Sequence, residues 1–260
     1  MPEGLEAEIY RRGAERAIGR RIESVLIDER QEMAMEIPGA LIRGSIVAAR
    51  RIGKLLLLDL EQAGALTLGI HFGMTGRLVV DGRAPIGALE YSSGRDDPGW
   101  DRFAVTFEDG GVMRVNDPRR WARFVLDPVV ERLGPDFFTV TADHLLSAFD
   151  RRRAPLKSVL LDQGVVAGFG NMCVDEILWQ AALSPMTPAR DVPRAAVERF
   201  VQVARAHLPA MLDRGGSNCG TIDPPIRAAL PPCPRDGAPL HRDRVAGRTT
   251  IWCPTHQVER

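Results

Sequence analysis

Between residues 124 and 141 the hydrophobic pattern of the chain changes from short β segments to helical spacing. Short apolar stretches separated by Gly, Asp-Gly and Pro-Gly breaks fill residues 22–124, and such stretches predict strands. The predicted strands are 46–48, 55–58, 66–68, 77–80, 103–107 and 112–115. Helical spacing covers residues 6–18, ended by Gly19, and then 142–149, 156–161, 174–181 and 195–212. The pattern therefore predicts an α+β chain, with a β-sandwich or barrel first and a helical part after it.

The last thirty residues are rich in Pro, Cys, His and Arg, and they contain too little apolar residue for a core of their own. Such a segment needs a cross-link, such as a bound metal ion, to hold its fold. Cys233 and Asp236 form one pair, Cys253 and His256 form a second, and sixteen residues separate the pairs. Pairs at this spacing are how a zinc ribbon holds one structural ion. Two alternatives stay open: His241 replaces Asp236 as a ligand, or packing alone holds the hairpin.

The composition is that of a water-soluble globular protein. The 260 residues carry no net charge, and 32 of the 34 basic residues are arginines, the exceptions being Lys54 and Lys157. Several arginines are clustered, which suits forked contacts with phosphate. No apolar run reaches membrane-span length and the N-terminus is acidic, so we expect a cytoplasmic protein whose four cysteines are reduced.

The chain begins Met1-Pro2-Glu3, with Glu6 close behind. Removal of Met1 would leave Pro2 with a free secondary amine, and an α-amino group is partly unprotonated at neutral pH. Such an amine can attack a sugar C1′ to give an iminium, and Glu3 could move protons beside it. The alternative is structural: Pro2 opens a helix and the glutamates complement the helix dipole.

Four further segments have the composition of nucleic-acid contacts. Residues 71–77 form a glycine-rich connection that carries Met74, and residues 116–121 form a turn that carries Arg119 and Trp121. Apolar side chains on loops can fill the space that a flipped base leaves. Residues 160–171 predict a helix, a glycine-bearing turn and a second helix that starts near Asn171, an arrangement that binds phosphate. Arg248 belongs at or near the turn of the C-terminal hairpin.

These segments, together with Gly53-Lys54 and in this order, make the chain resemble the formamidopyrimidine-DNA glycosylase/endonuclease VIII family of base-excision repair enzymes. The resemblance runs from residue 2 to residue 257. It implies a β-sandwich with flanking helices over residues 1–127, a helix-two-turn-helix domain over 128–222 and a zinc ribbon over 223–260. It also implies one structural Zn²⁺, no organic cofactor, and a monomer that acts on damaged double-stranded DNA.

The resemblance also implies a role for each matching residue. Pro2 would be the nucleophile, Glu3 the general acid that helps to open the sugar, and Glu6 a further active-site carboxylate. The remaining residues would contact DNA, with Lys54 and Arg248 also counted in the active site; they are Lys54, Met74, Arg119, Trp121, Lys157, Asn171 and Arg248.

The expected activity is excision of oxidised bases followed by β,δ-elimination at the abasic site through a Schiff base on Pro2. Formamidopyrimidines, oxidised pyrimidines and 8-oxoguanine are the candidate lesions. The alternatives are a catalytically silent protein of the same fold that binds damaged DNA, and a plain zinc-ribbon interaction module. The presence of Pro2, Glu3 and Glu6 together favours the enzyme.

Overall fold

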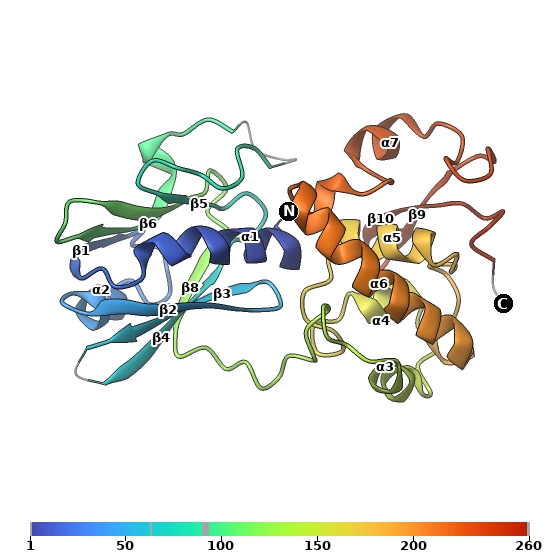
Figure 1. The fold of residues 1–260 in the computed structure, drawn as a ribbon, viewed down its shortest axis with the longest axis horizontal. Helices are drawn as coiled ribbons and strands as arrows, with labels where there is room; N and C mark the ends of the chain where they lie inside the picture. Colours follow the sequence, from blue (N-terminus) through green and yellow to red (C-terminus); the bar gives the residue numbers. More distant parts are fainter. Residues whose placement is uncertain (1, 63, 90–93, 259–260) are drawn as a thin grey trace. The chain divides into compact units, whose positions relative to one another are not determined.

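The structure is a computed structural model that describes residues 2–62, 64–89 and 94–258 (Figure 1). It divides into two compact units, residues 1–130 and residues 131–260. No helix within these described ranges is both long enough and apolar enough to cross a membrane.

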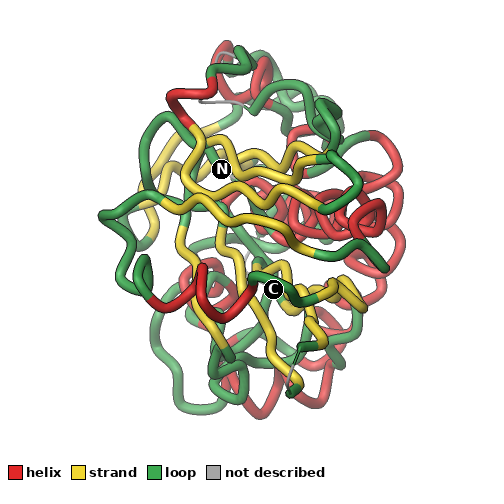
Figure 2. Tube along the Cα trace, turned by 90° about the vertical axis from the view of Figure 1, so that its left-hand side faces the viewer, coloured by secondary structure: helices red, strands yellow, loops and turns green. Residues whose placement is uncertain are grey.

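Unit 1 contains two four-stranded antiparallel sheets, whose strands are yellow in Figure 2. The first has the order β1-β6-β7-β5, formed by Ile22–Ile27, Asp101–Phe107, Val112–Asn116 and Arg77–Val80. The second has the order β2-β3-β4-β8, formed by Ser45–Ile52, Leu55–Glu61, Ala65–His71 and Arg123–Leu126. Every predicted strand lies inside one of these elements, whereas β1 and β8 were not among the predicted segments.

One hydrophobic core serves both sheets, because it takes buried residues from each of them. Helix α1 (Gly4–Ala14) contacts β2, β3 and β5 and contributes Tyr10 and Ala14 to this core (Figure 1). The predicted helix over residues 6–18 is thus present as α1 followed by the short 3₁₀ helix η1 (Glu15–Ala17), and Gly19 follows with a φ of +82°. A second short helix, α2 (Glu36–Leu41), was not predicted.

Unit 2 is mainly helical. Its helices are α3 (Ala142–Phe149), α4 (Leu156–Leu160), α5 (Asn171–Gln180), α6 (Arg194–Arg214) and α7 (Pro224–Ala229). The predicted helices match α3 to α6 within three residues at either end. A hairpin of β9 (His241–Val245) and β10 (Arg248–Trp252) follows. Unit 2 also contains the short 3₁₀ helices η3 (Ala189–Asp191) and η4 (Ser217–Cys219), and unit 1 contains a further one, η2 (Pro98–Trp100).

The C-terminal hairpin packs on helix α5. Trp179 of α5 shares a small core with Ile222, Cys233, Ile251 and Cys253. This agrees with the inference that the tail has no sufficient core of its own. The predicted domain boundary at residues 222/223 stays a prediction, since the hairpin and the helices together form one compact unit.

Candidate functional site

The N-terminal carboxylates are locked into the start of α1. Glu3 is the N-cap residue, and its backbone N–H donates to Glu6 Oε2 over 2.7 Å. The Glu3 side chain accepts in return from the backbone of Glu6, which completes a reciprocal capping box. Glu3 and Glu6 are only 1% and 3% exposed. Pro2 precedes the cap, so it lies outside the first helical turn, and the arrangement fixes the residue directly after Pro2. Met1 lies outside the described residues.

Helix α1 is also tied to the loop that carries Met74. The buried Tyr10 hydroxyl donates to the Gly76 carbonyl oxygen over 3.2 Å. Burial, and then the charge of Glu6, raise the pKa of Tyr10 well above its usual value, so the phenol stays a donor. Met74 is half-buried at the tip of this loop.

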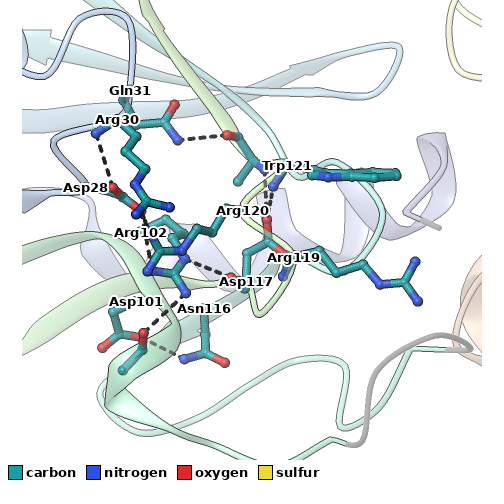
Figure 3. Close-up of polar contacts among 12 residues, drawn as sticks. Asp28, Arg30, Gln31, Asp101, Arg102, Asn116, Asp117, Arg119, Arg120 and Trp121 are labelled. Atoms are coloured by element: carbon teal, nitrogen blue, oxygen red, sulfur yellow. Dashed lines mark hydrogen bonds and ion pairs between the residues drawn. The ribbon is translucent and has the colours of Figure 1, made fainter.

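The turn that carries Arg119 and Trp121 is organised by the buried carboxylate of Asp117 (Figure 3). Asp117 Oδ2 accepts from the backbone N–H groups of Trp121 (2.6 Å) and Ala122 (2.8 Å), and Oδ1 accepts from that of Arg119 (3.1 Å). The side chains of Arg119 and Trp121 are exposed, and Trp121 is 51% accessible. A large aromatic side chain at such exposure on a well-held turn is suited to contact a partner.

Lys54 lies at the β2–β3 turn, where Gly53 has a φ of +57°. Arg51 holds this turn by donating to the Gly53 carbonyl oxygen over 2.9 Å. Next to Lys54 the structure places His71, the last residue of β4, whose backbone pairs with that of Leu55. Burial, followed by the charges of Lys54 and Arg123, lowers the pKa of His71.

Lys54, His71 and Arg123 thus lie near one another at the same sheet, where the two cations favour the neutral form of His71. His71 was not predicted as a site residue, although it opens the glycine-rich segment 71–77. Only the strand pairing reveals that it neighbours Lys54.

In unit 2, Asn171 is the first residue of α5, and Gly170 is its N-cap. Gln163 shapes the preceding turn: its amide nitrogen donates to the carbonyl oxygen of Phe169 over 3.0 Å, and its amide oxygen accepts from Gly168 N over 3.0 Å. Gly168 has a φ of +114°, and a Cβ there would lie 2.5 Å from the Phe137 ring. The glycine-bearing turn that the sequence predicted therefore presents the N-terminus of α5 and Asn171.

Lys157 is fully buried inside unit 2. Its side chain is 0% exposed, and its Nζ lies 2.6 Å from Asp175 Oδ1. Nζ also donates to Thr250 Oγ1 (2.8 Å) and to the Thr249 carbonyl oxygen (3.1 Å). The prediction that Lys157 touches DNA directly is therefore corrected: a fully buried, paired ammonium holds protein groups together.

Arg248 begins β10, directly after the turn at Ala246 and Gly247, as the sequence predicted. Its side chain is exposed. Arg227 donates to Asp175 Oδ2 (2.7 Å) and, like Lys157, to the carbonyl oxygen of Thr249 (3.1 Å). The carbonyl next to Arg248 is thus anchored by two buried cations that share one carboxylate.

Cys233, Asp236, Cys253 and His256 come together at the base of the hairpin, with their ligand atoms all within 4.8 Å of one another. His256 Nδ1 lies 3.3 Å from Asp236 Oδ2 and 3.6 Å from Cys233 Sγ, and Cys253 Sγ lies 3.4 Å from Asp236 Oδ2. Tetrahedral zinc bonds of about 2.0–2.3 Å imply ligand separations of roughly 3.3–3.8 Å. These four residues could therefore hold one metal ion.

The surroundings of this cluster suit a metal as well. His256 Nε2 lies 3.3 Å from the Trp179 carbonyl oxygen, which leaves Nδ1 toward the cluster. Burial raises the pKa of the Cys253 thiol, and a bound dication would favour the thiolate. His241, the alternative ligand, lies outside the cluster and packs against Trp252.

The two units therefore carry different parts of the predicted site. Unit 1 brings together the N-terminal carboxylates, the Met74 loop and the Asp117 turn, with Lys54 on the same sheet as His71. Unit 2 carries Asn171, Arg248, the buried Lys157 and the four candidate metal ligands.

Comparisons with known proteins agree with this layout. The family model for the formamidopyrimidine-DNA glycosylase N-terminal domain matches residues 1–124, and that for the H2TH domain of the same enzyme matches residues 133–223. A formamidopyrimidine-DNA glycosylase of Geobacter metallireducens is 30% identical over 287 residues, covering 99% of this chain and 100% of the relative. One of Acidithiobacillus ferrooxidans is 32% identical over 279 residues, covering 97% and 98%.

Two solved structures show the same fold. The Lactococcus lactis Fpg in complex with DNA containing N7-benzyl-Fapy-dG has a TM-score of 0.82 at 22% identity, covering 98% of this chain and 99% of that one. The complex of the same protein with DNA containing an oxidised pyrimidine has a TM-score of 0.80 at 23% identity, with the same coverage.

Proposed function

The chain belongs to the formamidopyrimidine-DNA glycosylase/endonuclease VIII family, and on that premise we propose that it excises oxidised bases from double-stranded DNA and then cleaves the resulting abasic site. The observation that carries the proposal is the buried capping box, which fixes Glu3, the residue directly after Pro2, through the hydrogen bond from its backbone N–H to Glu6. A helix cap alone does not require two carboxylates at 1% and 3% exposure.

The proposed chemistry starts at the amine of Pro2 once Met1 has been removed. The nitrogen attacks C1′ of the damaged nucleotide, the C1′–base bond breaks, and the base leaves with a proton. Glu3 protonates the ring oxygen O4′ as the sugar opens, which gives an iminium between Pro2 and C1′.

The iminium then acidifies the C2′ proton. Loss of that proton breaks the C3′–O bond by β-elimination, and a second loss breaks the C5′–O bond by δ-elimination. Water hydrolyses the remaining iminium and releases Pro2. Glu6 supports this sequence because it holds the backbone N–H of Glu3.

Lys54, Asn171 and Arg248 are proposed to contact phosphates around the flipped nucleotide. Each lies at a point that the local structure holds firmly: the β2–β3 turn, the N-terminus of α5 and the hairpin turn. Lys157 is proposed to act through the protein, because it anchors the strand that Arg248 begins. Met74, Arg119 and Trp121 are proposed to enter the duplex and fill the space of the flipped base.

Cys233, Asp236, Cys253 and His256 are proposed to hold one zinc ion. Its part would be structural: it would join the two ends of the β9–β10 hairpin and so support Arg248. In its absence the hairpin would depend on the small core that it shares with Trp179.

The test is a strand-cleavage assay on a duplex with a single formamidopyrimidine lesion, repeated on a duplex with a preformed abasic site. The wild-type protein should leave a one-nucleotide gap with phosphate on both flanking ends. Glu3→Gln should slow base excision by about 10²–10⁴-fold, the usual contribution of a general acid. Glu15→Gln, at an exposed position after the same helix, is the matched control and should cleave like the wild type. Binding without cleavage by the wild type would support the silent damaged-DNA-binding protein instead.

A further inference from the structure

We propose that Thr75 and Asp117 form a clasp that holds the two predicted wedge loops as one rigid block, and that this clasp serves the displacement of the damaged base. The wedge loops are residues 72–76, which carry Met74, and residues 117–122, which carry Arg119 and Trp121. The inference rests on the proposed function, because it concerns how these three side chains enter the duplex.

The clasp is one hydrogen bond between fully buried side chains. Thr75 Oγ1 donates to Asp117 Oδ1, and both residues are 0% exposed. Thr75 directly follows Met74, while Asp117 already binds the backbone N–H groups of Arg119 and Trp121. The same carboxylate therefore closes one wedge loop and joins it to the other.

The backbones of the two loops are also in direct contact. A Cβ built on Gly73 would lie 2.6 Å from the carbonyl carbon of Trp121, and Gly73 has a φ of +62°. Only glycine allows both this conformation and this approach. This contact is independent of the Thr75 hydroxyl, and it puts the residue before Met74 against the backbone of Trp121.

The far side of the second loop is braced by the sandwich (Figure 3). Arg102 Nε donates to the Asp117 carbonyl oxygen over 2.8 Å, and Gln31 Nε2 donates to that of Ala122 over 3.1 Å. Asp28 pairs with Arg102 (3.3 Å) and with Arg120 (3.5 Å). Tyr10 holds the first loop from α1. The clasp therefore joins two loops that are each anchored to the body of unit 1.

Rigidity matters for a wedge because base displacement costs energy. Flipping a base costs a few kcal/mol of unstacking and unpairing. A flexible loop would move away from the duplex instead, and the base would stay stacked. A preformed abasic site has no base to displace. Thr75 and Asp117 are thus positioning residues whose loss should slow excision of a base more than cleavage of an abasic site.

The test compares Thr75→Val, which replaces the hydroxyl by a methyl group, with Thr75→Ser, which keeps it. Thr67→Val is the matched control, because it removes a similar bond, Thr67 Oγ1 to Asp59 Oδ1 (2.9 Å), far along β4 from the wedge loops. Single-turnover rates are measured on a formamidopyrimidine duplex and on an abasic duplex. Hydrogen exchange of residues 117–122 is measured on the free proteins.

Thr75→Val should excise the base at least 10-fold more slowly, a barrier increase of about 1.4 kcal/mol, and should cleave the abasic duplex within twofold of the wild type. Amide exchange in residues 117–122 should accelerate. Thr75→Ser and Thr67→Val should match the wild type in all three measurements.

The clasp is refuted if Thr75→Val excises the base within twofold of the wild-type rate, or if excision and abasic cleavage slow equally. Unchanged exchange in residues 117–122 refutes it as well. A wild-type protein that acts on neither duplex would refute the proposed function, and the exchange measurement would still decide the clasp.

Discussion

Replacing Lys157 by methionine should destabilise unit 2 strongly, although the two side chains have similar length and packing. The substitution keeps an apolar stem in a fully buried position and removes only the ammonium. Asp175 then loses the cation at 2.6 Å, and the hydrogen bonds to Thr249 and Thr250 disappear.

Removing one partner of a buried ion pair costs about 3–5 kcal/mol, because it leaves an uncompensated charge. Asp175 still keeps Arg227 at 2.7 Å and the N–H of Ile251 at 3.2 Å. We therefore expect Lys157→Met to lower the free energy of unfolding by about 3 kcal/mol, the lower end of this range. At an m-value of about 2 kcal/mol per M of urea, this loss lowers the midpoint by roughly 1.5 M.

The assay follows urea unfolding by tryptophan emission. In a background with phenylalanine in place of Trp100 and Trp121, the remaining tryptophans, Trp179 and Trp252, both report on unit 2. Arg194→Met is the control, since it removes a cation from an exposed pair with Asp143 in the same unit. Its midpoint should stay where the wild type has it.

A loss of less than about 1 kcal/mol in Lys157→Met would contradict the cost expected for a buried pair, because so small a loss is typical of an exposed pair. A further contradictory result is a normal midpoint combined with a salt dependence of duplex binding that is weaker by about one phosphate contact. That combination would mean that Lys157 faces DNA directly.

Two further predictions concern His71 and the metal cluster. Because burial and the nearby cations lower the pKa of folded His71, the unfolded chain takes up a proton first as the pH falls below about 6.5, so stability decreases toward acid. His71→Asn should flatten the fall in urea midpoint between pH 7 and pH 5, and an unchanged slope would contradict this. The purified protein should contain one zinc per chain by elemental analysis, and its removal by a chelator should lower the unfolding midpoint seen by Trp179 and Trp252. An unfolding midpoint that does not change on chelation would contradict a structural role for the metal.

The regular elements were largely predictable from the sequence because their signals are local. Apolar stretches between glycine breaks located six strands, and helical spacing located α1 and α3 to α6. The ligand spacing of Cys233, Asp236, Cys253 and His256 identified the side chains that the structure gathers into one cluster. Strands β1 and β8 were not among the predicted segments, and each of them buries only one residue.

The contacts that position the site were beyond the reach of local patterns. Lys157 resembles a surface lysine in a helix, and its partners Asp175 and Thr250 lie 18 and 93 positions further along the chain. Thr75 and Asp117 are 42 positions apart, and no local sequence pattern around either residue indicates that they pair. Such pairings follow from how strands and helices pack, which spacing alone does not define.

The proposed excision and lyase chemistry depends most on the amine of Pro2, and borohydride trapping on a duplex with one abasic site measures the reaction of this amine. The protein must first be shown by mass spectrometry to begin at Pro2. We expect a covalent DNA adduct that peptide mapping places on Pro2, and a loss of this adduct when Met1 is retained. A protein that starts at Pro2, binds the duplex and gives no adduct, or gives one on Lys54 instead, would contradict this expectation.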